Sequence, residues 1–133
     1  MPRNGGNNKG KLYDRILSQV IRKMSTGSVM LLNNDGLQIA EKTCGFNDSD
    51  GIWGSANRLI DAGERALADL NKDKTFFMNQ ICESKEFFMI TGRVNQDISY
   101  AILSNKVNKI SLGMLKLFAD NLKAQVNEVD SNS

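Results

Sequence analysis

Three short apolar segments between residues 75 and 103 constrain the fold of this chain more than any other feature of its sequence. They cover residues 75–82, 86–91 and 98–103, are rich in aromatic and β-branched side chains, and are separated only by hairpin-length connections. The second and third segments are apolar almost throughout, which indicates strands covered on both faces of a sheet. The first segment turns polar at Asn79 and Gln80, which favours a position at a sheet edge. An uncharged edge of this kind invites pairing with another subunit.

A further hairpin is predicted between residues 28 and 42. Residues 28–32 form a short apolar run, and residues 37–42 alternate between apolar and polar side chains, as a half-covered edge strand does. The intervening Asn-Asn-Asp-Gly sequence, residues 33–36, predicts a turn because Asn and Gly tolerate positive φ. It resembles the start of a calcium loop but lacks the later glutamate ligand, so we interpret it as a turn.

Three segments have helical periodicity, and the middle one has an unusual composition. Helices are predicted over residues 11–24, 52–70 and 109–129. Half of the apolar arc of the middle helix is made of the small residues Ala62, Gly63 and Ala66. A glycine inside a helix costs about 1 kcal/mol relative to alanine, so Gly63 indicates close approach by another element. That element is either the chain's own sheet or a second helix across a subunit interface.

The length of the chain fits one domain. Its 133 residues can bury a core without disulfides or metal ions. Residues 1–10 contain three asparagines and three glycines and are predicted to be a disordered leader. Residues 11–129 are predicted to form the single domain, and residues 130–133 a short tail.

The missing residue types exclude most forms of self-contained catalysis. The sequence has no histidine, so neither a Ser-His-Asp nor a Cys-His arrangement can form within it. Cys44 and Cys82 cannot complete a zinc site alone and are expected to be free thiols. Phosphate-binding, dinucleotide-binding and zinc-protease motifs are also missing from the sequence. We therefore predict a protein that is not an enzyme and that needs no cofactor or metal.

Apolar runs and charge indicate where the protein works. The longest apolar runs have four or five residues, far short of a membrane span, and no signal-peptide pattern is present, so we expect a cytoplasmic protein. The net charge is +2, but residues 1–25 carry +5, which leaves −3 for the remainder. This basic arm is either the solvated face of a helix or a contact for an acidic partner or an endomembrane surface. Nucleic acid is not expected, because only Tyr13 interleaves the basic residues.

The order of these elements and several short motifs resemble the Roadblock/LC7 family. The matching segments are residues 31–36 in the hairpin, residues 62–66 in the middle helix and residues 113–116 at the start of the last helix, and the resemblance spans about residues 12–129. Within the family, the hairpin, residues 45–50 and residues 113–116 are most similar to the late endosomal adaptor subunit of the Ragulator scaffold. Prokaryotic GTPase regulators of the family have the same set of helices. The family's dynein light chains typically lack the long last helix.

The resemblance implies both a fold and an assembly. The implied fold is α/β (α+β), a five-stranded antiparallel sheet with the middle helix on one face and the two terminal helices on the other. The implied assembly is a homodimer, or a heterodimer with another roadblock subunit, formed by the middle helices and the adjacent strand. The interface residues expected on this basis are Ala56, Leu59, Ala62, Gly63, Ala66, Phe77 and Asn79.

The function implied by the resemblance is that of a scaffold or adaptor that binds and regulates a Ras-like small GTPase. Arg58, Arg65 and Arg93 are candidates for an arginine finger, a side chain that enters the active site of a bound GTPase. An arginine on a helix face is far more often a partner in a surface ion pair, so we assign that role to none of them. The alternative is a motor-cargo adaptor of the dynein light-chain type, which touches no GTPase.

Overall fold

The computed structural model describes residues 2–45, 50–68, 70, 79–106 and 110–131 of the chain. Within these ranges, three helices and five strands follow one another in the order predicted from the sequence. Their bounds are α1 Pro2–Met24, β1 Gly27–Asn33, β2 Gln38–Cys44, α2 Asp50–Leu67, β3 Gln80–Glu83, β4 Phe87–Arg93, β5 Ile98–Asn105 and α3 Leu112–Ser131. The predicted α/β fold class and element order are confirmed.

The five strands form one antiparallel sheet in the order β2-β1-β5-β4-β3. The central strands β1 and β5 pair along their whole lengths, from Gly27 opposite Ser104 to Asn33 opposite Ile98. Nearly every residue of these two strands is buried. The edges of the sheet are β2 and β3, so both strands that the sequence placed at an edge lie at one.

The β1–β2 turn is built by its own asparagine and glycine, as predicted. The side-chain Oδ1 of Asn33 accepts hydrogen bonds from the backbone N–H groups of Asp35 and Leu37, both at 2.9 Å. Gly36 has a φ of +81°, in the left-handed region that glycine adopts without a steric cost. A Cβ atom at Gly36 would lie 2.9 Å from Nδ2 of Asn57, so the turn comes close to α2.

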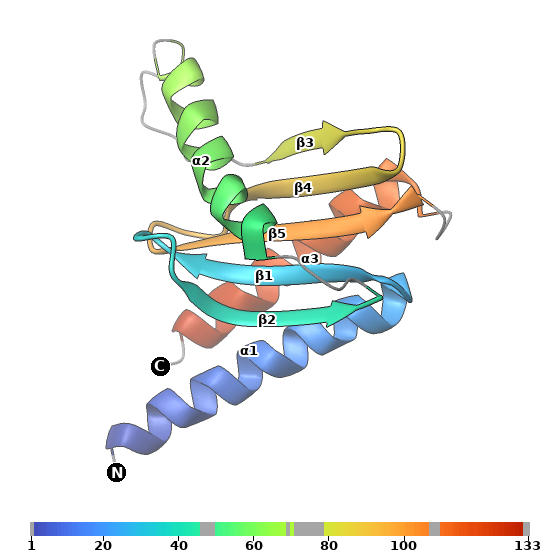
Figure 1. The fold of residues 1–133 in the computed structure, drawn as a ribbon. Coiled ribbons are helices and arrows are strands. Elements are labelled where there is room, and N and C mark those ends of the chain that lie inside the picture. The colour runs from blue at the N-terminus through green and yellow to red at the C-terminus, as the bar shows by residue number, and fades with distance from the viewer. Residues whose placement is uncertain (1, 46–49, 69, 71–78, 107–109, 132–133) are drawn as a thin grey trace.

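The two faces of the sheet carry different layers (Figure 1). α1 and α3 cover one face, where buried residues of both helices meet side chains of the central strands. The strand residues in this core are Val29, Leu31, Ile90, Tyr100 and Ile102, with Ile98 at the start of β5. The opposite face carries α2 and a smaller core, formed by Met30, Leu32, Trp53, Ala56, Ala101 and Leu103. The layer arrangement implied by the family resemblance is confirmed.

A polar network fixes α1 against the end of α3. The hydroxyl group of Tyr13 donates to Asp130, and Asn95 in the β4–β5 turn donates to Oδ2 of Asp130 and to Oδ1 of Asn127, both at 2.9 Å. Lys9 Nζ lies 3.3 Å from Oδ1 of Asp130. Burial alone would raise the pKa of Asp130, but these donors outweigh it and hold that pKa below its usual range. The network therefore determines which side of α1 faces solvent.

The ends of the helices differ from the predictions. α1 begins at Pro2, so residues 2–10, which belong to the predicted disordered leader, are helical. Proline suits the first turn of a helix because its missing N–H needs no partner there. α3 begins at Leu112 and extends to Ser131, into the predicted tail. The division of the chain into leader, domain and tail stays a prediction.

The strands also differ from the predictions in two respects. Most of the predicted strand over residues 75–82 lies outside the described residues, and β3 begins at Gln80. The strand predicted over residues 86–91 was expected to be covered on both faces. In the structure, Phe87, Phe88 and Met89 at the start of β4 are only partly buried.

Candidate dimer interface

One side of α2 anchors this helix to the sheet. Trp53, Ala56 and Ile60 are buried, and they recur at the spacing of one helix face. Nε1 of Trp53 donates a hydrogen bond of 2.5 Å to Oε2 of Glu41 on β2. The first half of α2 is therefore anchored to β1 and β5 by apolar packing and to β2 by this hydrogen bond.

Arg93, at the end of β4, holds the second half of α2. Its guanidinium group donates from Nε and Nη2 to the two carboxylate oxygens of Glu64, at 2.9 and 2.7 Å. Nη1 also donates to Asn34 at 3.0 Å and to Ser99 at 3.4 Å. The bonds to Glu64 raise the pKa of Arg93, against the opposing effect of burial. A two-point charged contact of this kind fixes the rotation of the helix as well as its position.

The small-residue side of α2 has no cover among the described residues. Ala62 and Ala66 are exposed, and Leu59 and Gly63 are half-buried. At about 100° per residue, these four positions lie on the flank of the helix opposite to Asn57 and Glu64, which face the β1–β2 turn and Arg93. Leu70, beyond the end of α2, is 77% exposed. The predicted alternative in which the small residues pack on the chain's own sheet is therefore wrong for Ala62 and Ala66.

A strip of the sheet beside α2 is only partly buried. Phe87 and Met89 lie on the same face as the α2 core and are only partly buried. They stand at the opposite end of β4 from Arg93, and Figure 1 shows that α2 crosses only one part of this face. Sequence reasoning missed these two residues, although their spacing of two along a strand places them on one face.

The β3 edge completes the candidate surface. β3 pairs with β4, from Gln80 opposite Thr91 to Glu83 opposite Phe88, and forms the end of the sheet. Ile81 is 46% exposed on this edge. Oε1 of Gln80 is buried and has no hydrogen-bond partner among the described residues. A strand edge with an unsatisfied acceptor beside it favours pairing with another chain.

The predicted interface residues are brought together only in part. Leu59, Ala62, Gly63 and Ala66 share one flank of α2, whereas Ala56 is fully buried in the core of its own chain. Asn79 lies apart from them, because its side chain accepts a hydrogen bond from the hydroxyl group of Tyr100, a residue of the α1/α3 core. Phe77 lies outside the described residues.

The three candidate arginine fingers differ in their exposure and in their contacts with carboxylates. Arg93 is bound to Glu64, and Arg65 lies 3.1 Å from Asp61 in an exposed ion pair one helical turn apart. Arg58 is exposed on α2. Cys44 and Cys82 are free thiols, as expected, and the described residues contain no group of three or more side chains that could hold a metal ion. None of the described helices is long and apolar enough to cross a membrane.

Solved structures share this architecture, although no protein-family model and no curated protein sequence matches the chain. MglB from Myxococcus xanthus is similar with a TM-score of 0.79 at 14% sequence identity, over 92% of this chain and 90% of that one. A structure described as MglB with a tetrameric arrangement has a TM-score of 0.73 at 16% identity, over 91% and 92%. A Roadblock/LC7 domain from Streptomyces avermitilis has a TM-score of 0.70 at 16% identity, over 90% and 95%. At such identities, the likeness shows a shared fold.

Proposed function

We propose that this chain, which has the Roadblock/LC7 fold, is a dimerising scaffold that binds and regulates a Ras-like small GTPase and has no active site of its own. The observation that carries the proposal is the open side of α2. Ala62 and Ala66 are exposed on α2, Phe87 and Met89 are partly buried on the face of the sheet that α2 covers, and β3 is the edge strand beside β4.

A second roadblock subunit fits this surface. Small side chains allow two helices to approach closely, so a partner's α2 can lie against Ala62, Gly63 and Ala66 and cover Phe87 and Met89. Two β3 edges can then pair antiparallel and continue the sheet from one subunit into the next. In a homodimer the same patch serves both subunits, as two-fold symmetry requires. A heterodimer with another roadblock subunit uses the same patch on this chain.

Regulation of a GTPase is supported by the family resemblance and by the chemistry of the chain. With no histidine in the sequence and with Arg65 and Arg93 engaged by carboxylates, the chain is suited to hold a GTPase in one conformation rather than to supply a reacting group. The dynein light-chain type of adaptor is the weaker candidate, because α3 is a full 20-residue helix with five buried residues, and those light chains typically lack it.

The first experiment measures mass by multi-angle light scattering. We expect the purified chain to have about twice its own 14.8 kDa. The variant Ala62→Gln/Ala66→Gln keeps good helix formers but adds bulk on the small-residue flank, and it should shift the protein to monomer. The control Ala124→Gln, exposed on α3, should stay dimeric. A folded wild type that remains monomeric at high concentration would overturn the homodimer and require another subunit.

The second experiment tests the GTPase. The dimer is mixed with a panel of Ras-like GTPases from the same organism, each loaded with GDP or a non-hydrolysable GTP analogue. We expect one member to add to the mass in one nucleotide state only, with a change in GTP hydrolysis or GDP release. Arg58→Ala should bind and regulate as wild type does. Loss of GTPase stimulation with intact binding would instead identify Arg58 as a finger, and the absence of any bound GTPase would overturn the assignment.

A further inference from the structure

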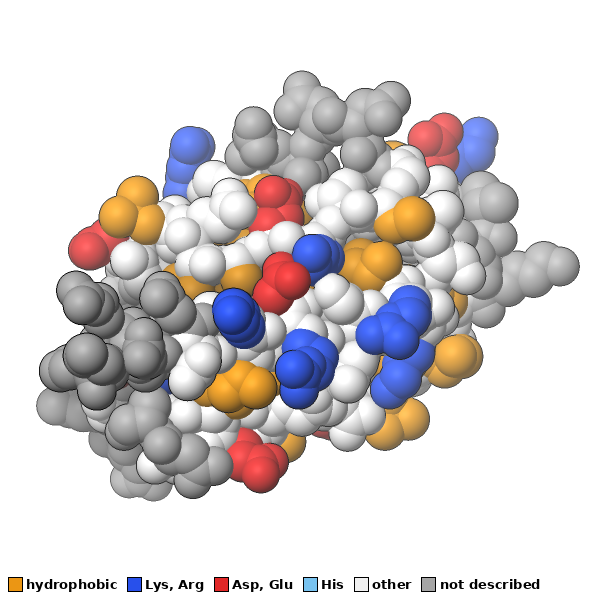
Figure 2. Space-filling view, turned by 90° about the horizontal axis from the view of Figure 1, so that it is seen from below, with side chains coloured by type: hydrophobic (Ala, Val, Ile, Leu, Met, Phe, Trp, Pro, Cys, Tyr) orange, Lys and Arg blue, Asp and Glu red, His pale blue; other side chains and the backbone are white. Residues whose placement is uncertain are grey.

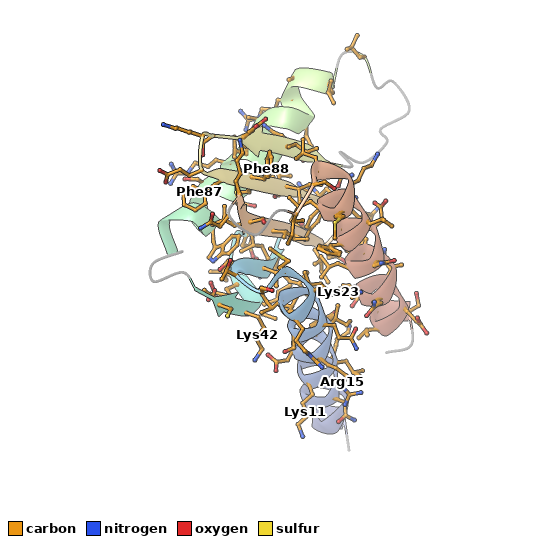
Figure 3. The ribbon with its side chains drawn as sticks, turned by 90° about the vertical axis from the view of Figure 1, so that its right-hand side faces the viewer. Lys11, Arg15, Lys23, Lys42, Phe87 and Phe88 are labelled. Carbon is orange, nitrogen blue, oxygen red and sulfur yellow. The ribbon has the colours of Figure 1, made fainter. Side chains whose placement is uncertain are left out.

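We propose that the outer side of α1 is a docking surface for an anionic lipid bilayer. The surface is formed by three basic side chains along one side of α1, Lys11, Arg15 and Arg22, with Lys23 about 100° around the helix, over Phe118 of α3; we call these four side chains the basic stripe. All four are exposed. At about 100° per residue, Lys11, Arg15 and Arg22 fall within about 40° of one another around the helix, and the rise from the first to the last is about 16 Å. Figure 3 shows Lys11, Arg15 and Lys23 in succession along α1.

The charge of the basic stripe is not neutralised locally. Among the residues that the structure describes, none of its four side chains forms an ion pair with a carboxylate. The one acidic residue of α1, Asp14, is paired at 3.2 Å with Lys42 of β2. Lys42, beside the helix in Figure 3, thereby offsets the single negative charge of α1 and leaves the four basic side chains in excess. The positive potential of α1 is therefore directed outward.

The orientation of the stripe is fixed by contacts elsewhere in the fold. Tyr13, Leu17 and Met24 are buried on the opposite side of α1, and the hydrogen bonds of Tyr13 and Asn95 to Asp130 prevent the helix from rotating. The basic side chains thus project from a rigid layer. Binding by a rigid surface needs no ordering of the helix and loses less entropy than binding by a disordered arm.

Exposed apolar side chains accompany the stripe, and they favour a bilayer over other acidic partners. Lys23 lies over the ring of Phe118 on α3, and Met114, one turn before Phe118, is 44% exposed. The neighbouring Leu117 is 60% exposed, and Leu12 on α1 is 37% exposed. Figure 2 shows Lys and Arg side chains with apolar side chains between them on the face that contains α1. Cations together with exposed apolar side chains are what binding at a lipid headgroup layer requires.

The basic stripe does not depend on the proposed dimer. α1 packs against β2 and β1, and Figure 1 shows it beyond β2, at the opposite end of the sheet from β3. Two subunits joined through their β3 edges would therefore carry their stripes at opposite ends of the assembly, and each stripe would bind a bilayer independently.

The test is flotation with vesicles of two compositions. We expect the full chain to float with vesicles of phosphatidylcholine and phosphatidylserine at 50 mM NaCl, to bind pure phosphatidylcholine at least tenfold less, and to dissociate at 300 mM NaCl. Arg15→Gln/Arg22→Gln should lower the affinity for the anionic vesicles about tenfold or more, because each cation near such a surface contributes about fivefold. The matched control Arg58→Gln/Lys85→Gln removes two exposed cations from other surfaces and should bind as wild type does.

Two further measurements separate the membrane proposal from its alternatives and from the dimer. Leu117→Gln should weaken binding to anionic vesicles without altering stability. Ala62→Gln/Ala66→Gln should be monomeric and bind anionic vesicles as wild type does, while Arg15→Gln/Arg22→Gln keeps its dimer mass. Equal binding by the stripe and control variants would overturn the proposal. Binding to poly-glutamate without binding to anionic vesicles would also overturn it, because the stripe would then recognise an acidic polypeptide.

Discussion

The two faces of the sheet differ in how completely their apolar side chains are buried. On the α1/α3 side, two helices meet the sheet in a single core that includes fully buried large side chains such as Leu17, Tyr100 and Leu122. On the α2 side, one helix crosses the sheet, and Phe87 and Met89 are left half-covered. One face therefore buries the larger core within the chain, and the other has partly buried apolar side chains that the proposed partner would cover.

Because of this difference, we expect the free energy of unfolding and self-association to depend on different faces of the sheet. Substitutions on the α1/α3 side should change the free energy of unfolding with little effect on self-association. Substitutions on the open part of the α2 side should do the opposite. The four predictions below test that separation, beginning with the largest expected effect.

Leu122→Ala should have the largest effect on folding. Leu122 is 1% exposed in the α1/α3 core, so truncation leaves a cavity and should lower the free energy of unfolding by about 3–4 kcal/mol. Urea unfolding at one protein concentration measures this change. Leu117→Ala, exposed on the same helix, should differ from wild type by no more than about 0.5 kcal/mol. Equal losses for the two variants would contradict the assignment of the core.

Phe87 and Phe88 offer a matched comparison, because they are adjacent on β4 and point to opposite faces (Figure 3). Phe88 packs against the α1/α3 core, with Nζ of Lys106 4.6 Å from its ring centroid, so Phe88→Ala should lower the free energy of unfolding by about 2 kcal/mol. Phe87→Ala should instead raise the dimer dissociation constant at least about tenfold. Light scattering over a dilution series, together with urea unfolding, measures both. If Phe88→Ala weakened the dimer and Phe87→Ala only lowered stability, the interface would lie on the α1/α3 face instead.

Arg93→Ala tests the attachment of α2 to the sheet. The loss of its two bonds leaves the partly buried Glu64 without this partner, so the free energy of unfolding should fall by about 2 kcal/mol. Arg93→Lys keeps the charge but not the two-point geometry and should recover only part of that loss. Arg65→Ala removes an exposed ion pair and should cost about 0.5 kcal/mol or less.

Asp130 predicts a smaller, pH-dependent effect on the α1/α3 side. Because its pKa is lower in the folded chain than in the unfolded chain, folding gains stability above about pH 4 and loses it as the pH falls through the folded value. Urea midpoints measured between pH 6 and pH 3 should therefore decline less steeply for Asp130→Asn than for wild type. Tyr13→Phe, which removes one donor, should fall between them. Parallel curves for all three proteins would contradict the role of this network.

The parts of the fold that were predictable from sequence depend on contacts close along the chain. The turn at residues 33–36 is built by Asn33 and Gly36 themselves, so its composition was sufficient to predict it. The helices and strands could be predicted from the spacing of apolar residues, because that spacing depends only on which side of each element is buried. Their order was enough to support the resemblance to the Roadblock/LC7 family.

The parts that were not predictable depend on contacts between distant segments. Tyr13 and Asp130 are 117 positions apart, and Arg93 and Glu64 are 29 apart, so no local pattern indicates either pair. Asn79 was placed in the interface from its position in an edge strand, but alternation along that strand turns its side chain toward Tyr100 on the opposite face. The exposure of Ala62 and Ala66 could be settled only by the position of α2 over the sheet.

The two edges of the sheet have consequences for how far assembly can proceed. β2 lies under α1, and its Glu41 and Lys42 are engaged by Trp53 and Asp14, whereas β3 lies at the opposite edge with Ile81 exposed. A chain with two unguarded edges can add copies without limit and grow into a fibre. In the proposed dimer, the pairing of two β3 edges would use the outer edge of each subunit, and the charged β2 edges at both ends would stop the extension of the sheet at two copies.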